Sequence, residues 1–464
     1  MYELTMNLKI NSKTPLYEQI YHFIKKDIQR GKIAQGEKLP STRALSKHLE
    51  VSRSTATLAY EQLLSEGFIE SVPCRGFFVA QIEELYHLVP TQAKESKREV
   101  SRKRYLYDFT PNGVDLNSFP YHVWRKLSKD ILVDDRTELF RSGDPQGEYG
   151  FRNAICNYLY QARGVNCTPD QIIIGAGSDY LFMLLAMILG PHHKIAFEDP
   201  TYKQAYRLAD SLSYTTVPVS MDKDGMKVLE LSGTDADIAY VTPSHQYPTG
   251  IIMPMKRRLE LLRWAREGKE RYIVEDDYDS EFRYKGKPIP ALQGYDRQES
   301  VIYLGTFSKS IAPAIRLSYM VLPKALLQIY HKRHRFLNST VSKVDQLIVQ
   351  RFLEEGYYER HLNKMRALYK GRHDTLIEAL KPLSGICRIF GEHAGVHLLL
   401  AFEKGKSEEE LILQAEQRGI KVYGLNDYRI QRDTSDQPTV LLGYANLSEE
   451  QLKSAAQILK ECWH

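Results

Sequence analysis

The feature that most constrains the fold is a regular alternation of short apolar runs with longer, helix-length stretches in the middle of the chain. The apolar runs cover residues 172–174, 195–197, 239–241, 272–274 and 301–304, and the helix-length stretches include 179–189, 203–212 and 256–266. Strands that alternate with helices are typical of an α/β fold with a mostly parallel sheet covered on both faces. From Pro323 the pattern is mainly helical, and after Gly391 shorter strands and helices predict a small C-terminal α+β subdomain.

The last of these apolar runs leads into a turn that contains a lysine. Gly305 ends the run, Thr306 and Lys309 lie in the turn, and Arg316 follows seven residues after the lysine. An amine at the end of a strand is well placed to form a Schiff base with an aldehyde cofactor. The Thr306 hydroxyl and the Arg316 guanidinium suit a phosphate on that cofactor. A solvated lysine in a loop is the alternative interpretation of the same turn.

Two other strand ends carry residues that suit a planar, phosphorylated ligand. After the run at 172–174, the backbone N–H groups of Ala176, Gly177 and Ser178 open a helix and suit a phosphate at its N-terminus. Tyr202 follows the run at 195–197 and offers an aromatic ring for stacking on a planar cofactor. Ordinary helix–strand packing and ordinary aromatic packing are the alternatives for these two features.

A group of carboxylates follows the run at 272–274. A buried carboxylate such as Asp276 would keep a pyridine nitrogen protonated, and Tyr278 would donate to a phenolic oxygen. A metal site or a solvated turn is the alternative for Asp276, Asp277 and Asp279. We expect no metal, because no histidine or further carboxylate joins them at a useful spacing.

The front of the chain has a different character, and it is basic. Residues 1–107 carry 17 Lys/Arg and 12 Asp/Glu, which accounts for the whole net charge of +5. Two short helical patterns joined by the turn Glu50-Val51-Ser52 predict a helix-turn-helix, and Phe68–Ser71 and Gly76–Val79 predict a hairpin wing. We therefore predict a DNA-binding module over residues 8–80, with a small helical protein-contact module as the alternative.

The motifs in this module make the prediction specific. Leu39-Pro-Ser-Thr-Arg-Ala-Leu45, Val51-Ser-Arg-Ser-Thr-Ala56, Leu64-Ser-Glu-Gly-Phe-Ile-Glu70 and Arg75-Gly76 closely resemble the winged helix-turn-helix of the GntR family of bacterial transcription factors. The resemblance implies contacts with double-stranded DNA in three places. Ser41 and Arg43 would contact phosphates, and Arg75 and Gly76 would form the wing. The residues expected in the major groove are Ser52, Arg53, Ser54 and Thr55.

Residues 81–107 have no sustained apolar period and contain a basic cluster between Lys94 and Arg104. This composition is typical of a linker between two domains. Direct contact of the basic cluster with DNA is the alternative interpretation.

The strand-end motifs of residues 108–464 occur in the order found in fold-type I aminotransferases, which this part of the chain resembles. The resemblance implies pyridoxal 5′-phosphate as cofactor, held on Lys309 as an internal aldimine. It places Asp276 at the pyridine nitrogen, Tyr278 at the O3′ position and Tyr202 on the ring. The implied phosphate cup consists of Ala176, Gly177, Ser178, Thr306 and Arg316.

The two resemblances on one chain point to the MocR/GabR branch of GntR regulators, which implies a homodimer with two DNA-binding heads. Three positions depart from the enzymes: Leu441 replaces the arginine that holds a substrate carboxylate, Tyr247 replaces an asparagine, and the spacing from Asp276 to Tyr278 is one residue short. Possible substitutes for the missing arginine are His245, Arg429, Arg207 and Gln204.

The sequence therefore predicts a transcription regulator whose body senses pyridoxal phosphate itself or a small amine or amino acid. An active aminotransferase with a DNA-binding head is the alternative, and Leu441 argues for at most weak transaminase activity. No signal peptide is visible and no apolar run reaches about 20 residues, so we expect no membrane segment. The five cysteines have no metal-type spacing, so we expect free thiols in a protein of the reducing cytoplasm.

Overall fold

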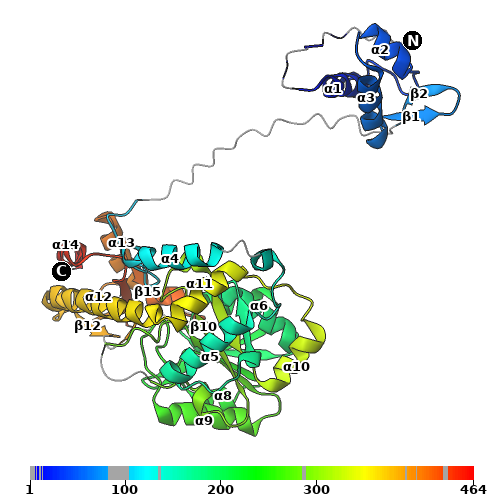
Figure 1. Cartoon of the computed structure of the whole chain (residues 1–464). Coiled ribbons are helices and arrows are strands. Elements are labelled where there is room, and N and C mark those ends of the chain that lie inside the picture. The colour runs from blue at the N-terminus through cyan, green and yellow to red at the C-terminus, as the bar shows by residue number, and fades with distance from the viewer. Residues whose placement is uncertain are drawn as a thin grey trace. The chain divides into compact units, whose positions relative to one another are not determined.

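A computed structural model describes residues 6, 8, 9, 12, 14–81, 104–133, 137–284, 289–391, 394–403, 405–431 and 437–463 (Figure 1). The chain divides into two compact units, Met1–Arg102 and Lys103–His464. Each unit has its own hydrophobic core. Most of the predicted linker, including the basic cluster except Arg104, falls on residues 82–103 and lies outside the described residues.

The first unit consists of three helices followed by a hairpin. Its elements are α1 Leu16–Gln29, α2 Thr42–His48, α3 Arg53–Ser65, β1 Ile69–Val72 and β2 Gly76–Val79. Apolar residues of α1 at helical spacing, such as Ile20, Ile24 and Ile28, are fully buried in a core shared with α3. β1 and β2 pair antiparallel with Val72 opposite Gly76. This arrangement confirms the predicted winged helix-turn-helix.

The large sheet of the second unit has eight strands in the order β4-β11-β10-β9-β8-β5-β6-β7. β10, β9, β8, β5 and β6 are parallel neighbours, whereas β11 runs antiparallel to both β10 and β4, and β7 to β6. The mostly parallel sheet is therefore confirmed. The strands are β4 Ile172–Gly175, β5 Lys194–Asp199, β6 Thr215–Asp222, β7 Gly225–Met226, β8 Ile238–Val241, β9 Tyr272–Asp277, β10 Val301–Thr306 and β11 Ser318–Val321.

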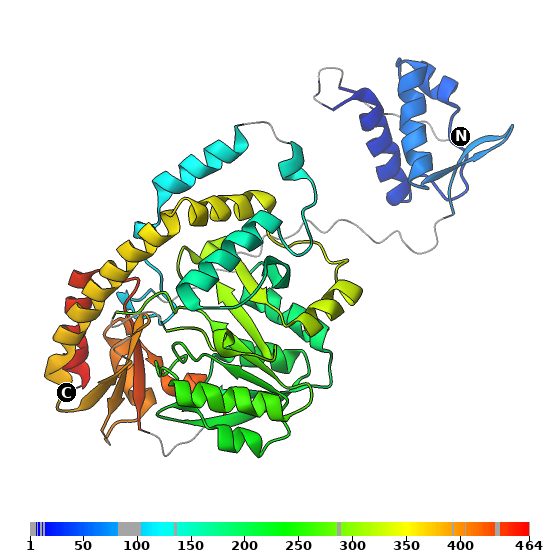
Figure 2. The ribbon, with the colours of Figure 1, turned by 60° about the horizontal axis from the view of Figure 1, so that its bottom comes forward.

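Helices cover both faces of this sheet, as Figure 2 shows. In β10, Tyr303 packs in a core with residues of α5 and α11, while its neighbour Ile302 packs in a second core with residues of α6 and α10. Successive side chains of a strand point to opposite faces, so strands in such a sheet are apolar throughout. The helices are α4 Tyr121–Leu132, α5 Tyr149–Arg163, α6 Ser178–Leu189, α7 Lys203–Ser211, α8 Val228–Ser232, α9 Met255–Glu267, α10 Lys324–Arg333 and α11 Lys343–Glu354.

The predicted small C-terminal subdomain is also present. Four antiparallel strands pair in the order β12-β13-β16-β15, and α12 and α14 lie side by side next to them (Figure 2). The short parallel pair β3–β14 joins the beginning of the second unit to this subdomain. The elements are β3 Tyr107–Asp108, α12 Tyr357–Leu380, β12 Cys387–Phe390, β13 His397–Phe402, α13 Glu408–Gln417, β14 Ile420–Lys421, β15 Tyr423–Gly424, β16 Thr439–Gly443 and α14 Glu449–Trp463.

Short 3-10 turns connect several of these elements: η2 Leu116–Ser118, η3 Thr137–Phe140, η4 Pro169–Gln171, η5 Gln293–Tyr295, η6 Pro313–Ile315, η7 Lys381–Leu383 and η8 Leu425–Tyr428. All five cysteines are free thiols. Within the described ranges, no helix is long and apolar enough to cross a membrane.

Candidate functional site

A cavity of about 240 Å³ opens where the carboxyl ends of β9 and β10 meet the beginning of α6. Ligands of open α/β sheets bind at this edge because the loops that leave the strands converge there. The cavity brings together residues from distant parts of the chain: Asn112, Ser178, Tyr202, Tyr247, Asp276, Tyr278, Thr306, Ser308, Lys309, Pro313 and Arg316.

Lys309 lies in the turn after β10 and faces this cavity. Loss of hydration lowers the pKa of its amine to about 8, although the Asp279 carboxylate opposes this shift. The Nζ atom donates a hydrogen bond to Asn112 Oδ1 at 2.9 Å. At pH 7 about one amine in ten would be uncharged and nucleophilic, compared with about one in 3,000 for an ordinary lysine.

Asp276 lies near the end of β9, on the wall of the same cavity. Its Oδ2 accepts a hydrogen bond from the Tyr240 hydroxyl at 2.5 Å. Burial raises the pKa of the Asp276 carboxyl to about 7, and the Tyr240 hydrogen bond partly offsets this effect. A cation next to this carboxylate would restore its ionised form, because an opposite charge favours ionisation.

The neighbouring Asp277 serves a different purpose. Its carboxylate accepts from Arg163 Nε at 2.8 Å and from the Tyr303 hydroxyl at 2.5 Å, and all three groups are buried. Adjacent residues of a strand face opposite sides of the sheet. Asp277 therefore holds α5 against the sheet, while Asp276 faces the cavity.

Tyr278 belongs to a compact polar group with a histidine and a carboxylate. His245 Nδ1 lies 2.8 Å from the Tyr278 hydroxyl and 2.9 Å from Asp279 Oδ2. Both His245 and Asp279 are buried. Burial is the main cause that raises the pKa of the Tyr278 phenol well above its ordinary value, so the phenol keeps its proton at neutral pH.

Aromatic rings form another wall of the cavity. The Tyr202 and Tyr247 rings meet edge to face with centroids 5.6 Å apart, and Tyr247 meets Tyr278 in the same way at 5.6 Å. The Tyr247 hydroxyl donates to the Tyr428 hydroxyl at 3.3 Å. Tyr247, which departs from the asparagine of the enzymes, therefore contributes a large apolar surface to the cavity.

The end of the cavity near α6 is suited to an anion. Arg316 Nη2 lies 3.3 Å from Asp179 Oδ2, and about half of the Arg316 side chain remains exposed. A side chain at Gly177, where φ is +98°, would collide with the Arg316 guanidinium. Ser178 begins α6, so its N–H has no partner within the helix. Positive charge and a helix N-terminus therefore converge here.

Hydroxyl groups complete this end. Thr306 Oγ1 accepts from the Ser308 N–H at 3.1 Å and from the Ser318 hydroxyl at 2.9 Å. Among the described residues, the buried Ser308 hydroxyl has no hydrogen-bond partner although it lines the cavity. Ser308 lies in the predicted turn but was given no role in the predicted phosphate cup, although its position beside Lys309 was a signal for one.

Two residues of the predicted phosphate cup, Ala176 and Gly177, are not among the described residues that line the cavity. The Ala176 N–H donates to Thr340 Oγ1 at 3.0 Å, and the Gly177 N–H donates to the Gly175 carbonyl at 2.8 Å. Both amides therefore already have partners in this conformation. The other predicted cofactor residues all line the cavity: Ser178, Tyr202, Asp276, Tyr278, Thr306, Lys309 and Arg316.

The position of the missing enzyme arginine is apolar. Leu441 is fully buried in β16, between Val440 and Leu442, which belong to the subdomain core. Leu441 faces the opposite side of the small sheet. On that side His397 Nε2 donates to the Pro248 carbonyl at 2.8 Å, which joins this sheet to the loop that carries Tyr247. Position 441 therefore provides no positive charge that could bind a substrate carboxylate.

Neither predicted effector residue lines the cavity within the part of the chain that the structure describes. His245 is buried behind Tyr278, and its Nδ1 is used by Tyr278 and Asp279. Arg429 directly follows η8, whose Tyr428 contacts Tyr247.

The predicted DNA-binding residues cluster on two helix starts and the hairpin of the first unit. Ser41 and Ser52 are the N-caps of α2 and α3, and each hydroxyl accepts a backbone N–H at 3.1 Å. The Arg75 guanidinium lies 5.8 Å from the centroid of the Phe78 ring. Six of the predicted residues are exposed and two, Thr55 and Gly76, are half-buried; the exposed ones are Ser41, Arg43, Ser52, Arg53, Ser54 and Arg75.

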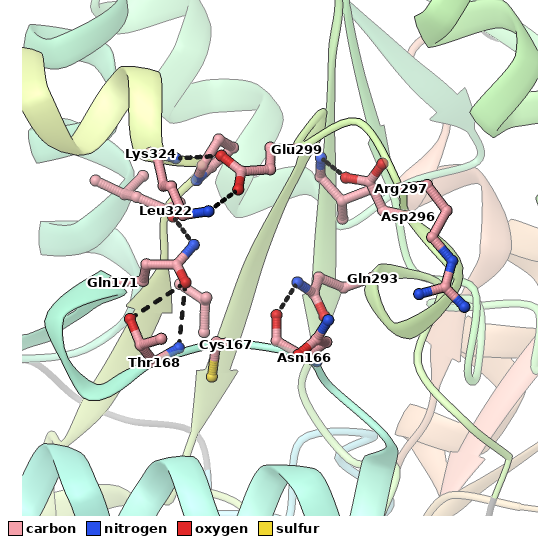
Figure 3. Close-up of a pocket in the computed structure, with 13 residues that line it drawn as sticks. Asn166, Cys167, Thr168, Gln171, Gln293, Asp296, Arg297, Glu299, Leu322 and Lys324 are labelled. Atoms are coloured by element: carbon pink, nitrogen blue, oxygen red, sulfur yellow. Dashed lines mark hydrogen bonds and ion pairs between the residues drawn. The ribbon is translucent and has the colours of Figure 1, made fainter.

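A second cavity, of about 330 Å³, lies at the opposite edge of the large sheet, next to the beginning of β10 (Figure 3). Several of its polar side chains bond to one another or to the backbone. Glu299 pairs with Lys324 at 2.6 Å, Gln171 donates to the Leu322 carbonyl at 3.0 Å, and Gln293 donates to the Asn166 carbonyl at 2.9 Å.

The residues of the first cavity fit pyridoxal phosphate. A half-buried amine of lowered pKa suits its aldehyde, and a buried carboxylate lining the same cavity suits its pyridine nitrogen. The Ser308 hydroxyl, which has no partner among the described residues, suits its phosphate together with Arg316. Within the described ranges, no group of residues could hold a metal ion.

Comparison with known families agrees with this geometry. The family described as aminotransferase class I and II matches residues 111–459, and bacterial regulatory proteins of the gntR family match residues 16–79. The uncharacterized HTH-type transcriptional regulator YhdI of Bacillus subtilis is 40% identical, with 99% of this chain and 98% of that protein covered.

Two further relatives match over nearly the full length. The probable rhizopine catabolism regulatory protein MocR of Rhizobium meliloti is 29% identical, with 98% of this chain and 94% of that protein covered. The HTH-type pyridoxine biosynthesis transcriptional regulator PdxR of Corynebacterium glutamicum is 28% identical, with 97% and 96% covered.

The chain belongs to the aminotransferase class I and II family and is a MocR-type regulator with a gntR-family head. The body of this MocR-type regulator has the fold of Pyrococcus horikoshii kynurenine aminotransferase, with a TM-score of 0.68 and 25% identity over 76% of this chain and 90% of that one. The MocR-type regulator is therefore a DNA-binding transcription regulator, and its cofactor is pyridoxal phosphate.

Proposed function

We propose that this MocR-type regulator holds pyridoxal phosphate covalently on Lys309 in the body (108–464) and alters DNA binding by the head (8–80) when that state changes. The observation that carries the proposal is the half-buried Lys309 amine, whose pKa is lowered to about 8, in a cavity with Asp276 on its wall. Asp276 would pair with the ring nitrogen, Tyr278 with the phenolic oxygen and Tyr202 with the ring face. Ser178, Thr306, Ser308 and Arg316 would hold the phosphate.

The head would contact a double-stranded operator through the exposed starts of α2 and α3 and through the hairpin tip. Ser41 and Arg43 would meet phosphates, Ser52, Arg53, Ser54 and Thr55 would enter the major groove, and Arg75 and Gly76 would form the wing contact. The exposure of the charged side chains in this set supports their availability to DNA.

We further propose a homodimer that acts in the cytoplasm. Large apolar side chains are exposed on the second unit, including Phe140 at 77%, Phe336 at 74% and Tyr121 at 60%. Exposed apolar surface of this kind favours association with a second copy. A dimer would carry two heads and would therefore recognise an operator with two half-sites.

The coenzyme itself is the signal that we favour over an amine or amino acid. Leu441 is apolar and fully buried, so the usual anchor for a substrate carboxylate is missing. The relative PdxR is named as a regulator of pyridoxine biosynthesis, which is consistent with a coenzyme signal. For the same reason we expect turnover of common amino acids to be weak or absent.

The test is operator binding by gel shift with coenzyme-free protein, repeated with pyridoxal phosphate alone and then with added amines and amino acids. A change of affinity with the coenzyme alone supports a coenzyme sensor. A change that requires one amine in addition identifies the body as a receptor for that amine. Unchanged operator binding under every condition contradicts the proposed regulation.

Arg43→Ala tests the assignment of the head. Loss of one phosphate contact should lower the slope of log affinity against log salt by about 0.9. Arg30→Ala is the matched control, because Arg30 is also exposed but lies at the end of α1, outside the proposed DNA surface. Equal effects of the two substitutions would remove Arg43 from the contact set.

A further inference from the structure

Asn112 lies in the segment that begins the second unit, and this segment is built into the small subdomain. β3 pairs with β14, and the Gly443 N–H donates to the Phe109 carbonyl at 2.8 Å. The Asn446 side-chain amide donates to the Asp108 carbonyl at 3.1 Å. The backbone of residues 107–113 is therefore anchored to the subdomain.

The Asn112 side chain contacts the large sheet region instead. Its Oδ1 accepts the hydrogen bond of Lys309 Nζ at 2.9 Å, across 197 residues of chain. The side chain also interacts with Tyr247, on another wall of the same cavity. The Asn112 side chain thus links residues 107–113, which follow the interdomain connection in the chain, to Lys309.

The chemistry of the amine determines whether this hydrogen bond persists. When Lys309 Nζ bonds to an aldehyde carbon, the carbonyl oxygen leaves as water and takes two hydrogens that the neutral amine nitrogen carried. The nitrogen then has no hydrogen left, or a single one if it is protonated again. Asn112 Oδ1 can only accept, so covalent loading of Lys309 removes or weakens its donor.

The choice of an amide also matters. Asn112 is a neutral acceptor, so it directs the amine hydrogens without adding the negative charge that would favour the ammonium form. The uncharged amine, which donates a hydrogen to Asn112, keeps its lone pair for the aldehyde.

We propose that Asn112 positions the free amine of Lys309 and that the hydrogen bond between them is lost when the coenzyme attaches to the lysine. Attachment of the coenzyme therefore loosens residues 107–113. The proposal rests on the proposed function, in which Lys309 carries the coenzyme. Residues 107–113 directly follow the connection to the head in the chain. Loss of the hydrogen bond would therefore transmit the state of the cavity to the DNA-binding unit through this segment.

Hydrogen–deuterium exchange of residues 107–113 in the full-length protein tests this loosening. In the wild type, exchange should rise severalfold when pyridoxal phosphate is added. In Asn112→Ala, exchange should already be fast without coenzyme and should not respond. Asn446→Ala is the matched control: it loosens the same segment without touching Lys309, so its exchange should still respond to the coenzyme.

A charge-bearing variant tests the positioning role. Asn112→Asp places a carboxylate beside the amine, which should favour the ammonium form and move half-maximal coenzyme loading to higher pH. Asn112→Ala should leave that pH near its wild-type value but should slow loading about fivefold, the effect of one lost hydrogen bond. An unchanged pH profile in Asn112→Asp would overturn the positioning role.

The outcomes separate this inference from the function on which it rests. If a visible absorbance band shows coenzyme on Lys309 but exchange of 107–113 is the same with and without coenzyme, the proposed loosening is wrong and the proposed function stands. If wild type and Lys309→Ala show the same absorbance, the coenzyme is not on Lys309 and both proposals fail.

Discussion

The two cavities at opposite edges of the large sheet differ in what their polar groups do. The cavity at the beginning of β10 is the larger, at about 330 Å³ compared with about 240 Å³, but Glu299 and Lys324 there pair with each other and its glutamine side chains bond to the backbone (Figure 3). The smaller cavity contains Lys309 with a lowered pKa and Asp276 with a raised pKa, and it contains the Ser308 hydroxyl, which has no hydrogen-bond partner in the described part of the chain. A buried hydroxyl without a partner among the described residues and pKa values shifted by burial, and not volume, therefore distinguish the candidate binding site.

Lys309→Ala is expected to have the largest effect. It removes the only proposed covalent attachment point, so the visible absorbance band of lysine-bound coenzyme should disappear on titration with pyridoxal phosphate. Lys324→Ala is the matched control, because Lys324 lines the other cavity and pairs with Glu299. A band that persists in Lys309→Ala would place the attachment at another amine.

Asp276→Ala should weaken binding of the coenzyme roughly tenfold to a hundredfold, because a hydrogen bond to a charged group contributes about 1.5–3 kcal/mol. The dissociation constant from equilibrium dialysis measures this effect. Full retention of affinity would shift the role of ring-nitrogen partner to Asp277, in spite of its ion pair with Arg163.

The rate of coenzyme loading should rise with pH. Because the folded-state pKa of Lys309 is lowered to about 8, its amine is mainly protonated below pH 8 and mainly free above it. The uncharged fraction rises from about 1% at pH 6 to about half at pH 8, which predicts an increase of roughly fiftyfold. Stopped-flow absorbance at several pH values measures it, and a rate that is constant over this range would contradict the lowered pKa.

Arg316→Ala should have a smaller effect, about fivefold on the dissociation constant of pyridoxal phosphate, because the guanidinium is half exposed and already pairs with Asp179. Binding of pyridoxal, which lacks the phosphate, is the internal control and should be unchanged. Equal losses for the two ligands would mean that Arg316 acts through folding and not through the phosphate.

Glu299→Gln should have the smallest effect. It removes the ion pair with Lys324, whose two side chains are 42% and 67% exposed, so unfolding free energy should fall by at most about 1 kcal/mol. The dissociation constant of the coenzyme should remain within about twofold of the wild type. A larger change would show that the second cavity communicates with the binding site.

Much of this architecture follows from local sequence patterns. The alternation of apolar runs and helix-length stretches predicted the strands β4, β5, β8, β9 and β10 and the helices α6, α7 and α9, because burial on both faces leaves strands apolar throughout. It did not predict β6, β7 or α8. The helix-turn-helix followed from the cap at Ser41, the turn before Ser52 and the hairpin around Arg75. Strand ends placed Asp276, Lys309 and Ser178 at one edge, since parallel strands end together.

Contacts between distant segments could not be predicted in this way. Asn112 reaches Lys309 across 197 residues, and Tyr240 reaches Asp276 from the neighbouring strand. The expectation of free amides at Ala176 and Gly177 failed because Thr340, far along the chain, occupies one of them and the turn itself closes the other.

The sequence by itself determined the two-part organisation and the order of the polar turns that follow the strands, and it pointed to Lys309 as the candidate attachment site. These properties follow from local periodicity and motif spacing, which are visible in the sequence itself. Only the tertiary structure decided which carboxylate faces the cavity, which hydroxyl lacks a partner and how far the lysine pKa falls. These properties depend on burial and on the packing of segments that are remote in sequence, and local patterns do not encode either.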